Sequence, residues 1–268
     1  MRVVSLGDLV LDVVVQLDQP LALGADASSR IRLSAGGQGA NVAAWLAALG
    51  GDAAWLGKRA DDEAGTLAAG KLHELGVDLL GPVAGSGNGV IVSLVGPDGE
   101  RSMCPDRGIA TELSVDDLSA ELLACDHLHV SGYALFAQPV CEAALEAIRL
   151  ARAYGARISL DLASWSAIRD AGADRFRSLV EALAPDVVFA NVEEDEIVGG
   201  AIGAALWIRK LGAEGCEFGD DRRSARDVPE VVDTTGAGDA LAAGWILGGP
   251  DLALEAAARC VQRVGAMP

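Results

Sequence analysis

Two glycines directly ahead of a helix-forming segment carry the clearest chemical signal in this sequence. Gly236 and Gly238 bracket Ala237, and mostly small residues follow as far as Gly244. Glycine lets successive backbone N–H groups turn toward one point, where the helix N-terminus adds partial positive charge, so the segment predicts an anion cradle. Asp239 follows in the first helical turn, where a carboxylate either caps the helix or accepts a proton as a general base. No Gly-Lys-Ser/Thr follows the glycines, so this is not a Walker loop.

A second glycine-rich turn occupies residues 35–43, which read Ala-Gly-Gly-Gln-Gly-Ala-Asn-Val-Ala. A dinucleotide fingerprint is excluded, because Val42 stands where glycine or alanine is required and no clean strand precedes the turn. What remains is a turn that brings backbone close to a ligand, with Asn41 able both to donate and to accept hydrogen bonds.

The rest of the chain alternates short apolar runs with segments of helical spacing. Strands are expected at 3–6, 53–56, 126–130, 157–161, 186–190 and 204–210, and helices at 41–49, 64–75, 139–154, 173–183 and 237–247. Strands separated by helices of this length need right-handed crossovers. The pattern therefore predicts an α/β fold with a doubly wound, mostly parallel sheet flanked by helices.

Two stretches break the alternation, at about 10–34 and 88–104. The second contains the turn Gly-Pro-Asp-Gly at 96–99, which is typical of a β-hairpin. We expect both stretches to form a small antiparallel β-lid, hinged at Gly36 and Gly37, on a single domain that spans residues 1–268. The apolar face and open edges of such a lid favour pairing with a second copy, which predicts a homodimer through the lid.

Charge and composition limit the partners. The chain has 21 basic and 39 acidic residues and a net charge of −18. Nucleic-acid binding is disfavoured because it needs a basic face, and no apolar run of about 18 residues predicts a membrane span. Five scattered cysteines without a C-x-x-C pair, and no signal peptide, predict buried free thiols in a cytoplasmic protein. No carboxylate spacing around His127 and His129 suggests a metal site.

Together, the two glycine segments resemble the signatures of the ribokinase-like carbohydrate kinases, the phosphofructokinase-B type. The run Asp-Thr-Thr-Gly-Ala-Gly-Asp at 233–239 is highly specific, and the order of elements agrees along nearly the whole chain. The resemblance implies that Asp239 is the catalytic base and that Gly236, Ala237 and Gly238 form the anion hole.

The same resemblance implies roles for further residues. Asn191 and Glu194 match an N-x-x-E motif that helps to place Mg²⁺ and phosphate, with Glu194 acting on the metal through water. The residues implied to line the nucleotide site are Asn191, Lys210, Gly212 and Gly215. The residues expected to bind the acceptor, including one lid cation nominated from the sequence, are Asp12, Gly37, Gln38, Asn41 and Arg107.

We therefore expect an enzyme that uses ATP and Mg²⁺, with a monovalent cation such as K⁺ as a further cofactor, to phosphorylate a hydroxymethyl group of a neutral sugar. An anionic acceptor is disfavoured by the net charge and because Gln38 stands where ribokinases often have lysine. Two alternatives stay open. One is a nucleoside kinase of the same family, and the other is a sugar-binding relative that has lost turnover, suggested by a short stretch at 197–204.

Overall fold

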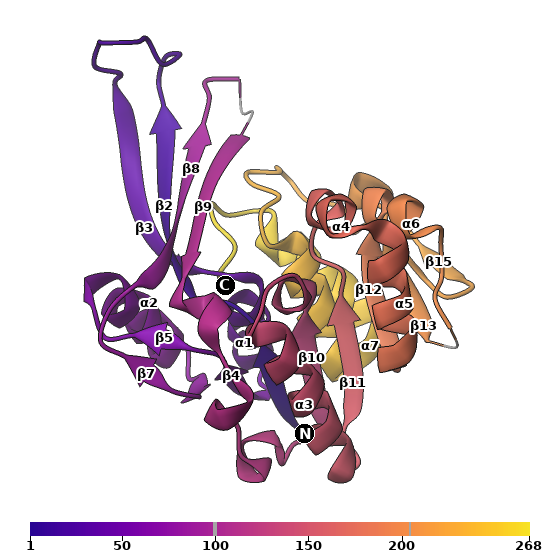
Figure 1. The fold of residues 1–268 in the computed structure, drawn as a ribbon. Coiled ribbons are helices and arrows are strands. Elements are labelled where there is room, and N and C mark those ends of the chain that lie inside the picture. Colours follow the sequence, from indigo (N-terminus) through magenta and orange to yellow (C-terminus); the bar gives the residue numbers. More distant parts are fainter. Residues whose placement is uncertain (99–100, 204) are drawn as a thin grey trace.

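A nine-stranded sheet runs through the body of the computed structural model, which describes residues 1–98, 101–203 and 205–268 (Figure 1). Its strand order is β15-β14-β13-β12-β11-β10-β1-β4-β6. Every neighbouring pair from β13 to β6 is parallel, and only β14 and β15 run antiparallel at one edge. This confirms the predicted doubly wound sheet. The strands are β1 (Arg2–Leu6), β4 (Asp52–Leu56), β6 (Asp78–Leu80), β10 (His127–Ser131), β11 (Arg157–Asp161), β12 (Val187–Asn191), β13 (Leu206–Lys210), β14 (Cys216–Phe218) and β15 (Asp221–Arg223).

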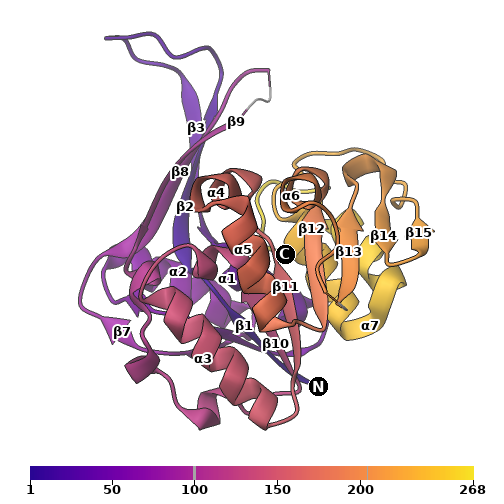
Figure 2. The ribbon, with the colours of Figure 1, turned by 45° about the vertical axis from the view of Figure 1, so that its right-hand side comes forward.

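Helices cover both faces of this sheet (Figures 1 and 2). Successive side chains of a strand point to opposite faces, so Val4 packs in the apolar cluster beneath α3 and α5 while Val3 packs in the cluster beneath α1 and α7. The helices on the first face are α3 (Val140–Ala153), α4 (Trp165–Ala171), α5 (Ala173–Leu183) and α6 (Val192–Val198). Those on the second face are α1 (Gln38–Ala48), α2 (Glu63–Glu74) and α7 (Ala237–Cys260).

A four-stranded lid rises from one end of the body (Figure 1). Its order is β3-β2-β8-β9, with bounds β2 (Val10–Leu17), β3 (Ser29–Gly36), β8 (Asn88–Val95) and β9 (Arg101–Gly108). The outer pairs are antiparallel, as predicted, whereas β2 and β8 are parallel. A parallel pair forms here because the chain passes through α1, β4 and α2 between the two strands, and such long crossovers permit it. The predicted hairpin turn falls partly on residues 99–100, outside the described residues.

Short elements complete the chain. A two-stranded parallel pair joins β5 (Arg59–Ala60) to β7 (Val83–Ala84) beside the lid. Helix α7 continues beyond its predicted end at residue 247, with a break in its helical geometry at Gly249 just before Pro250. The predicted strand start at residue 204 is also outside the described residues. The 3₁₀ turns are Ile109–Glu112, Val115–Asp117, Ala120–Leu123, Gly132–Leu135 and Gly212–Glu214.

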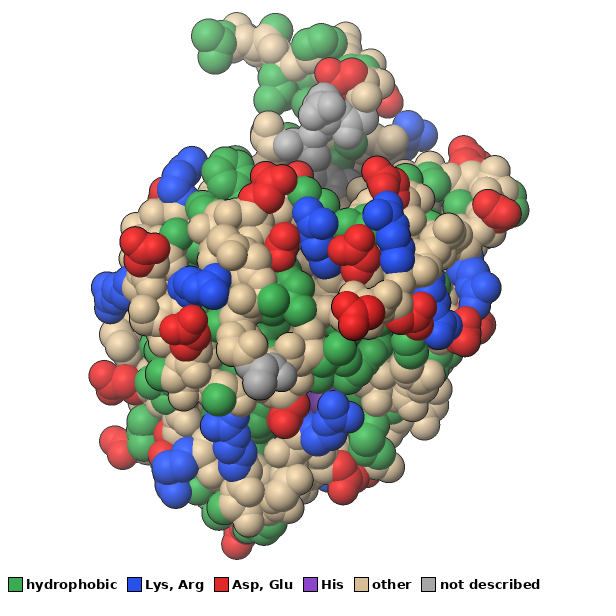
Figure 3. Space-filling view, turned by 90° about the vertical axis from the view of Figure 1, so that its right-hand side faces the viewer, with side chains coloured by type: hydrophobic (Ala, Val, Ile, Leu, Met, Phe, Trp, Pro, Cys, Tyr) green, Lys and Arg blue, Asp and Glu red, His purple; other side chains and the backbone are tan. Residues whose placement is uncertain are grey.

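Acidic and basic side chains are interspersed on the face shown in Figure 3, where the lid projects above the body. Within the described part of the chain, no helix is both long enough and apolar enough to cross a membrane. All five cysteines are free, and four are buried; the prediction of burial is wrong for Cys104, which is exposed on the lid strand β9.

Candidate active site

The carboxyl ends of three adjacent strands meet the N-terminus of α7 at one edge of the sheet. Strands β11, β12 and β13 end at Asp161, Asn191 and Lys210. Neighbouring parallel strands present their carboxyl ends at the same edge, which is where open α/β sheets bind ligands. The fold thus gathers polar side chains from distant parts of the chain around the glycine turn before α7.

Asp239 stands at the centre of this edge. Its Oδ2 accepts a hydrogen bond of 2.7 Å from Nδ2 of Asn41, which comes from α1. Burial, together with the negative charge of Asp161, raises the pKa of Asp239 to about 7, although the Asn41 hydrogen bond and the charge of Lys210 act in the opposite direction. A carboxylate with this pKa is suited to accept a proton near neutral pH.

The glycine turn before Asp239 has a backbone conformation that would be strained for any residue with a side chain. Gly236 has a φ of 79°, and a Cβ built on it would lie 2.6 Å from Cα of Ala266. Asp233 fastens the turn to the end of the chain: its Oδ1 accepts from the backbone N of Thr235 at 2.9 Å, and its Oδ2 accepts from N of Gly265 at 3.0 Å. The turn is therefore held by tertiary contacts and not by the helix alone.

Two cavities lie on either side of this turn. The first, of about 580 Å³, lies beneath the lid, and we call it the acceptor cavity; its wall includes the sequence-predicted residues Asp12, Gly37, Gln38, Asn41, Arg107, Gly236 and Asp239. The second, of about 440 Å³, we call the nucleotide cleft; its wall includes the sequence-predicted residues Asn191, Lys210, Gly212, Gly215, Ala237 and Gly238. All the sequence-predicted site residues except Glu194 therefore line one of two adjoining spaces.

Glu194 lies below the nucleotide cleft and is only 2% exposed. Its two carboxylate oxygens accept from the backbone N and the Nδ2 of Asn191, and its own backbone N donates to Oδ1 of Asn191 at 2.7 Å. These contacts form a capping box at the start of α6. Burial raises the pKa of Glu194, although the nearby charge of Lys210 opposes the shift.

A hydrogen-bonded chain connects the two cavities beneath the turn. Nζ of Lys210 donates to Oδ2 of Asp161 at 2.7 Å, and Nε2 of Gln38 donates to Oδ1 of the same carboxylate at 3.1 Å. Ser131 in turn donates to the side-chain oxygen of Gln38. Asp161 thereby joins a residue of the acceptor cavity to a cation of the nucleotide cleft.

The acceptor cavity also contains a charged residue, Asp8, that sequence reasoning missed. Asp8 forms an ion pair with Arg107, whose guanidinium lies 3.7 Å from the ring centroid of Tyr133. Burial raises the pKa of Asp8, although the charge of Arg107 works against this. The position of Asp8 just after β1 was an available signal, because polar residues that follow parallel strands lie at the ligand-binding edge. The contact with Arg107 had no local signal, since that residue comes from the lid.

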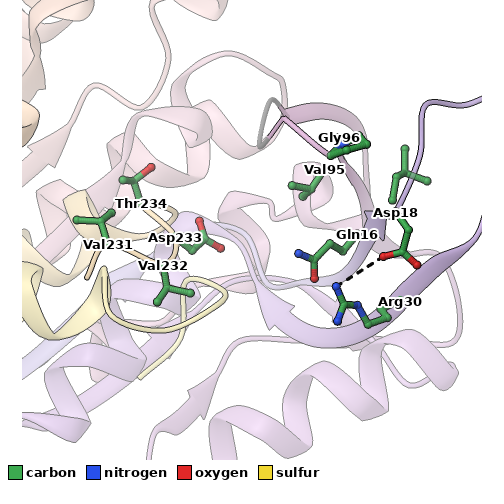
Figure 4. Close-up of a pocket in the computed structure, with 11 residues that line it drawn as sticks. Gln16, Asp18, Arg30, Val95, Gly96, Val231, Val232, Asp233 and Thr234 are labelled. Atoms are coloured by element: carbon green, nitrogen blue, oxygen red, sulfur yellow. Dashed lines mark ion pairs between the residues drawn. The ribbon is translucent and has the colours of Figure 1, made fainter. Parts of the chain in front are cut away.

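A third hollow, of about 800 Å³, separates the outer half of the lid from the segment that leads into the glycine turn (Figure 4). Gln16, Asp18 and Arg30 face it from the lid, where Arg30 and Asp18 form an ion pair of 3.6 Å. Residues 231–234 face it from the body. The outer half of the lid therefore stands away from the body, whereas its inner half lines the acceptor cavity.

Direct metal ligands are not clustered in the described residues: no group of three or more His, Cys, Asp or Glu side chains is placed to hold an ion there. His127 and His129 both bond to the hydroxyl of Ser159, at 2.8 and 2.9 Å. Burial lowers their pKa values to about 3 and about 4, so both rings are neutral at physiological pH. These histidines belong to the packed interior of the sheet.

Comparison with known proteins shows the family to which the chain belongs. The pfkB family carbohydrate kinase model matches residues 1–267. The chain belongs to this family. It is 34% identical to the ATP-dependent ribose-1-phosphate kinase of Halopiger xanaduensis, over 97% of this chain and 90% of that protein. It is 32% identical to fructokinase-1 of Zea mays, over 89% of this chain and 80% of the relative.

A solved kinase structure is similar to this chain in its fold. The adenosine kinase of Sinorhizobium meliloti matches with a TM-score of 0.85 and 25% identity, over 100% of this chain and 95% of that one. Membership of the family confirms the predicted ribokinase-like carbohydrate kinase and its fold. The named relatives include kinases of a sugar phosphate, a free sugar and a nucleoside, so they differ in their acceptors.

Proposed function

We propose that this protein transfers a phosphoryl group from ATP to a hydroxymethyl group of a neutral sugar. The observation that carries the proposal is the wall shared by the two cavities. Gly236 and Asp239 line the acceptor cavity, and Ala237 and Gly238 line the nucleotide cleft. A hydroxyl group on one side can thus approach a phosphoryl group on the other at a point that offers both a base and backbone N–H groups.

In this mechanism Asp239 accepts the proton of the attacking hydroxyl group. Its pKa of about 7 leaves a large fraction ionised at neutral pH while keeping the carboxylate basic. Asn41 orients the carboxylate through its 2.7 Å hydrogen bond. The backbone N–H groups of the turn from Gly236 to Gly238 stabilise negative charge that develops on the transferred group.

ATP and Mg²⁺ fit the donor set of the nucleotide cleft. The cleft offers the cation Lys210 beside the helix N-terminus, with Gly212 and Gly215 on its wall. Mg²⁺ usually keeps several water ligands, so Asn191 can act on it through water from the cleft wall, and Glu194, buried behind the wall with both oxygens bonded to Asn191, acts on these waters through that amide. The ion would neutralise phosphate charge. A requirement for K⁺ remains part of the proposal and is tested by omitting that ion.

The charges of the acceptor cavity favour a neutral acceptor. Among the residues that the structure describes, four carboxylates line the cavity, those of Asp8, Asp12, Asp170 and Asp239, against the single cation Arg107. Asp8 already pairs with that cation. A phosphate group on the acceptor would therefore meet carboxylates beside a cation whose charge Asp8 already neutralises. A nucleoside is the second candidate, because the aromatic ring of Phe136 and the side chain of Ile91 also line the cavity and offer apolar contact to a base.

The lid is proposed to close over the acceptor and exclude water, and to pair with a second copy. Closure would reduce the hollow between lid and body and limit wasteful hydrolysis of ATP. Pairing is supported by apolar cross-strand pairs such as Val15 with Ile31, the latter 62% exposed on the edge strand β3. The five free thiols and the use of ATP support a cytoplasmic location.

Release of ADP with a panel of acceptors tests the proposal. The panel contains fructose, ribose, adenosine and ribose 1-phosphate, each with MgATP and with or without K⁺. We expect a neutral sugar to give the highest kcat/KM. A tenfold advantage for ribose 1-phosphate, about 1.4 kcal/mol of transition-state preference, would overturn the choice of acceptor. Tight sugar binding without turnover of any member would instead favour the sugar-binding relative.

A further inference from the structure

Lys210 occupies an unusual position at the end of β13. Its side chain crosses the end of β12, the strand between β13 and β11, and reaches Asp161 at the end of β11. It also lies directly against the glycine turn: a Cβ built on Gly238 would be 3.3 Å from Nζ and 3.4 Å from Cδ of Lys210. The absence of a side chain at residue 238 therefore leaves the ammonium group beside the proposed anion hole.

This ammonium group is the one cation among the described residues that line the nucleotide cleft. The chain has only two other lysines, and both pair elsewhere: Lys58 with Asp117 and Lys71 with Glu74. An ammonium group has three N–H donors. Asp161 takes one of them, and the structure gives no second hydrogen bond to Nζ within its described residues. Two donors thus remain for a ligand in the cleft.

Asp161 is built to hold that ammonium group in place. The carboxylate is only 1% exposed, and the Lys210 side chain is 15% exposed. The other oxygen of Asp161 accepts from Nε2 of Gln38 and from the backbone N of Ala163, both at 3.1 Å. Because both oxygens are fixed by neighbours, the carboxylate cannot turn away. Burial opposes the charge on Lys210, but the carboxylates of Asp161, Glu194 and Asp239 raise its pKa, so the side chain stays protonated.

We propose that Lys210 contacts the terminal phosphoryl groups of the nucleotide and stabilises the charge of the transferred group, and that Asp161 is the residue that positions it. This inference rests on the proposed kinase function. The carboxylates of Glu194 and Asp239 also lie near enough to act on the charge of Lys210, so the described residues place more carboxylates than cations around the transfer point. A fixed ammonium group at Gly238 offsets part of that negative charge where phosphate must bind.

A purely structural role of Lys210 would give a different result for the variants. If Lys210 only neutralises Asp161, then Lys210→Met is harmful because it leaves a buried carboxylate unpaired. Removing both charges in Lys210→Met/Asp161→Asn should then restore the enzyme to the level of Asp161→Asn alone. The asparagine keeps an oxygen that can accept from Gln38 and Ala163. Lys71→Met, which breaks an exposed pair on α2, is the matched control.

The test measures kcat and KM with MgATP and the best neutral sugar of the panel. We expect Asp161→Asn to lower kcat about tenfold, and both Lys210→Met and the double variant to lower it about 100-fold, with the KM for sugar changed far less. Lys210→Arg should recover part of the loss. A double variant no slower than Asp161→Asn alone would overturn the proposal.

A binding measurement completes the test without any acceptor. The double variant should bind the non-transferable ATP analogue AMP-PNP, with Mg²⁺, at least about tenfold more weakly than Asp161→Asn does, and AMP about equally well. Equal loss for both nucleotides would overturn the proposal, because it would show a general defect of the cleft. Failure of the proposed function itself is recognised separately, as an absence of turnover by the unmodified protein.

Discussion

Replacing Asp239 with asparagine should slow the enzyme and, at the same time, make the protein more stable. Asparagine has the same size and can still accept the hydrogen bond from Asn41, but it cannot take up a proton. We expect turnover to fall about 100-fold or more, which is the usual range for loss of a general base. Nucleotide binding should be largely kept, since the backbone of the glycine turn is unchanged.

The gain in stability follows from the raised pKa. In the folded protein the pKa of Asp239 is about 7, against an ordinary value of 3.8, because burial and the charge of Asp161 disfavour the ionised form. Between these two values the unfolded chain loses its proton before the folded protein does, so the free energy of unfolding falls as pH rises. Each pKa unit corresponds to about 1.4 kcal/mol, so above pH 7 the shift from 3.8 to about 7 would lower the free energy of unfolding by about 4 kcal/mol. Because the carboxylate faces a cavity open to water, solvent screens its charge, and we expect a loss in unfolding free energy of about half that size.

Thermal unfolding at two pH values measures this effect. A gain of about 2 kcal/mol should raise the Tm of Asp239→Asn by about 5 °C at pH 8.5. At pH 5.5 the gain should be about half as large, because only part of the interval between the two pKa values has been crossed. In the unmodified enzyme, kcat/KM should fall tenfold for each pH unit well below about pH 7, since the base must be ionised.

Two results would refute the reasoning. A Tm for Asp239→Asn equal to or below that of the unmodified protein at pH 8.5 would show that Asp239 is not held in a desolvating environment. Near-normal turnover of the folded variant would show that Asp239 is not the base. Lys71→Met, an exposed substitution on α2, controls for effects of mutation on handling and concentration.

Three further predictions concern other parts of the site. Glu194→Gln should raise the Mg²⁺ concentration needed for half-maximal turnover more than it raises the KM for sugar; the reverse would contradict a role at the metal. Gly236→Ala should lose at least about 2 kcal/mol more stability in chemical denaturation than Gly50→Ala. Both glycines have positive φ, but only at Gly236 would the new Cβ meet backbone, 2.6 Å from Cα of Ala266; equal losses would refute the clash. The protein should sediment as a dimer at micromolar concentration and Ile31→Lys as a monomer, whereas a monomeric unmodified protein would exclude pairing through the lid.

Much of the fold followed from short-range patterns in the sequence. The predicted helix at 173–183 has the same bounds as α5, and the strand at 157–161 has those of β11. Apolar runs and helix-stopping glycines are local signals, and local sterics decide them. The parallel pairing of β2 with β8 was not predicted, because a turn signal describes one hairpin and says nothing of how two hairpins join.

What the sequence determined by itself is the chemistry on offer: a glycine turn before a helix, an aspartate beside it, and asparagine and glutamate at another strand end. These residues act through backbone geometry and spacing that neighbours in the chain establish. Only the tertiary structure decided how they work together. Asn41 reaches Asp239 across 198 residues, and Lys210 reaches Asp161 across an intervening strand. A pKa near 7 depends on burial and on charges from several such segments, so no local pattern could have predicted it.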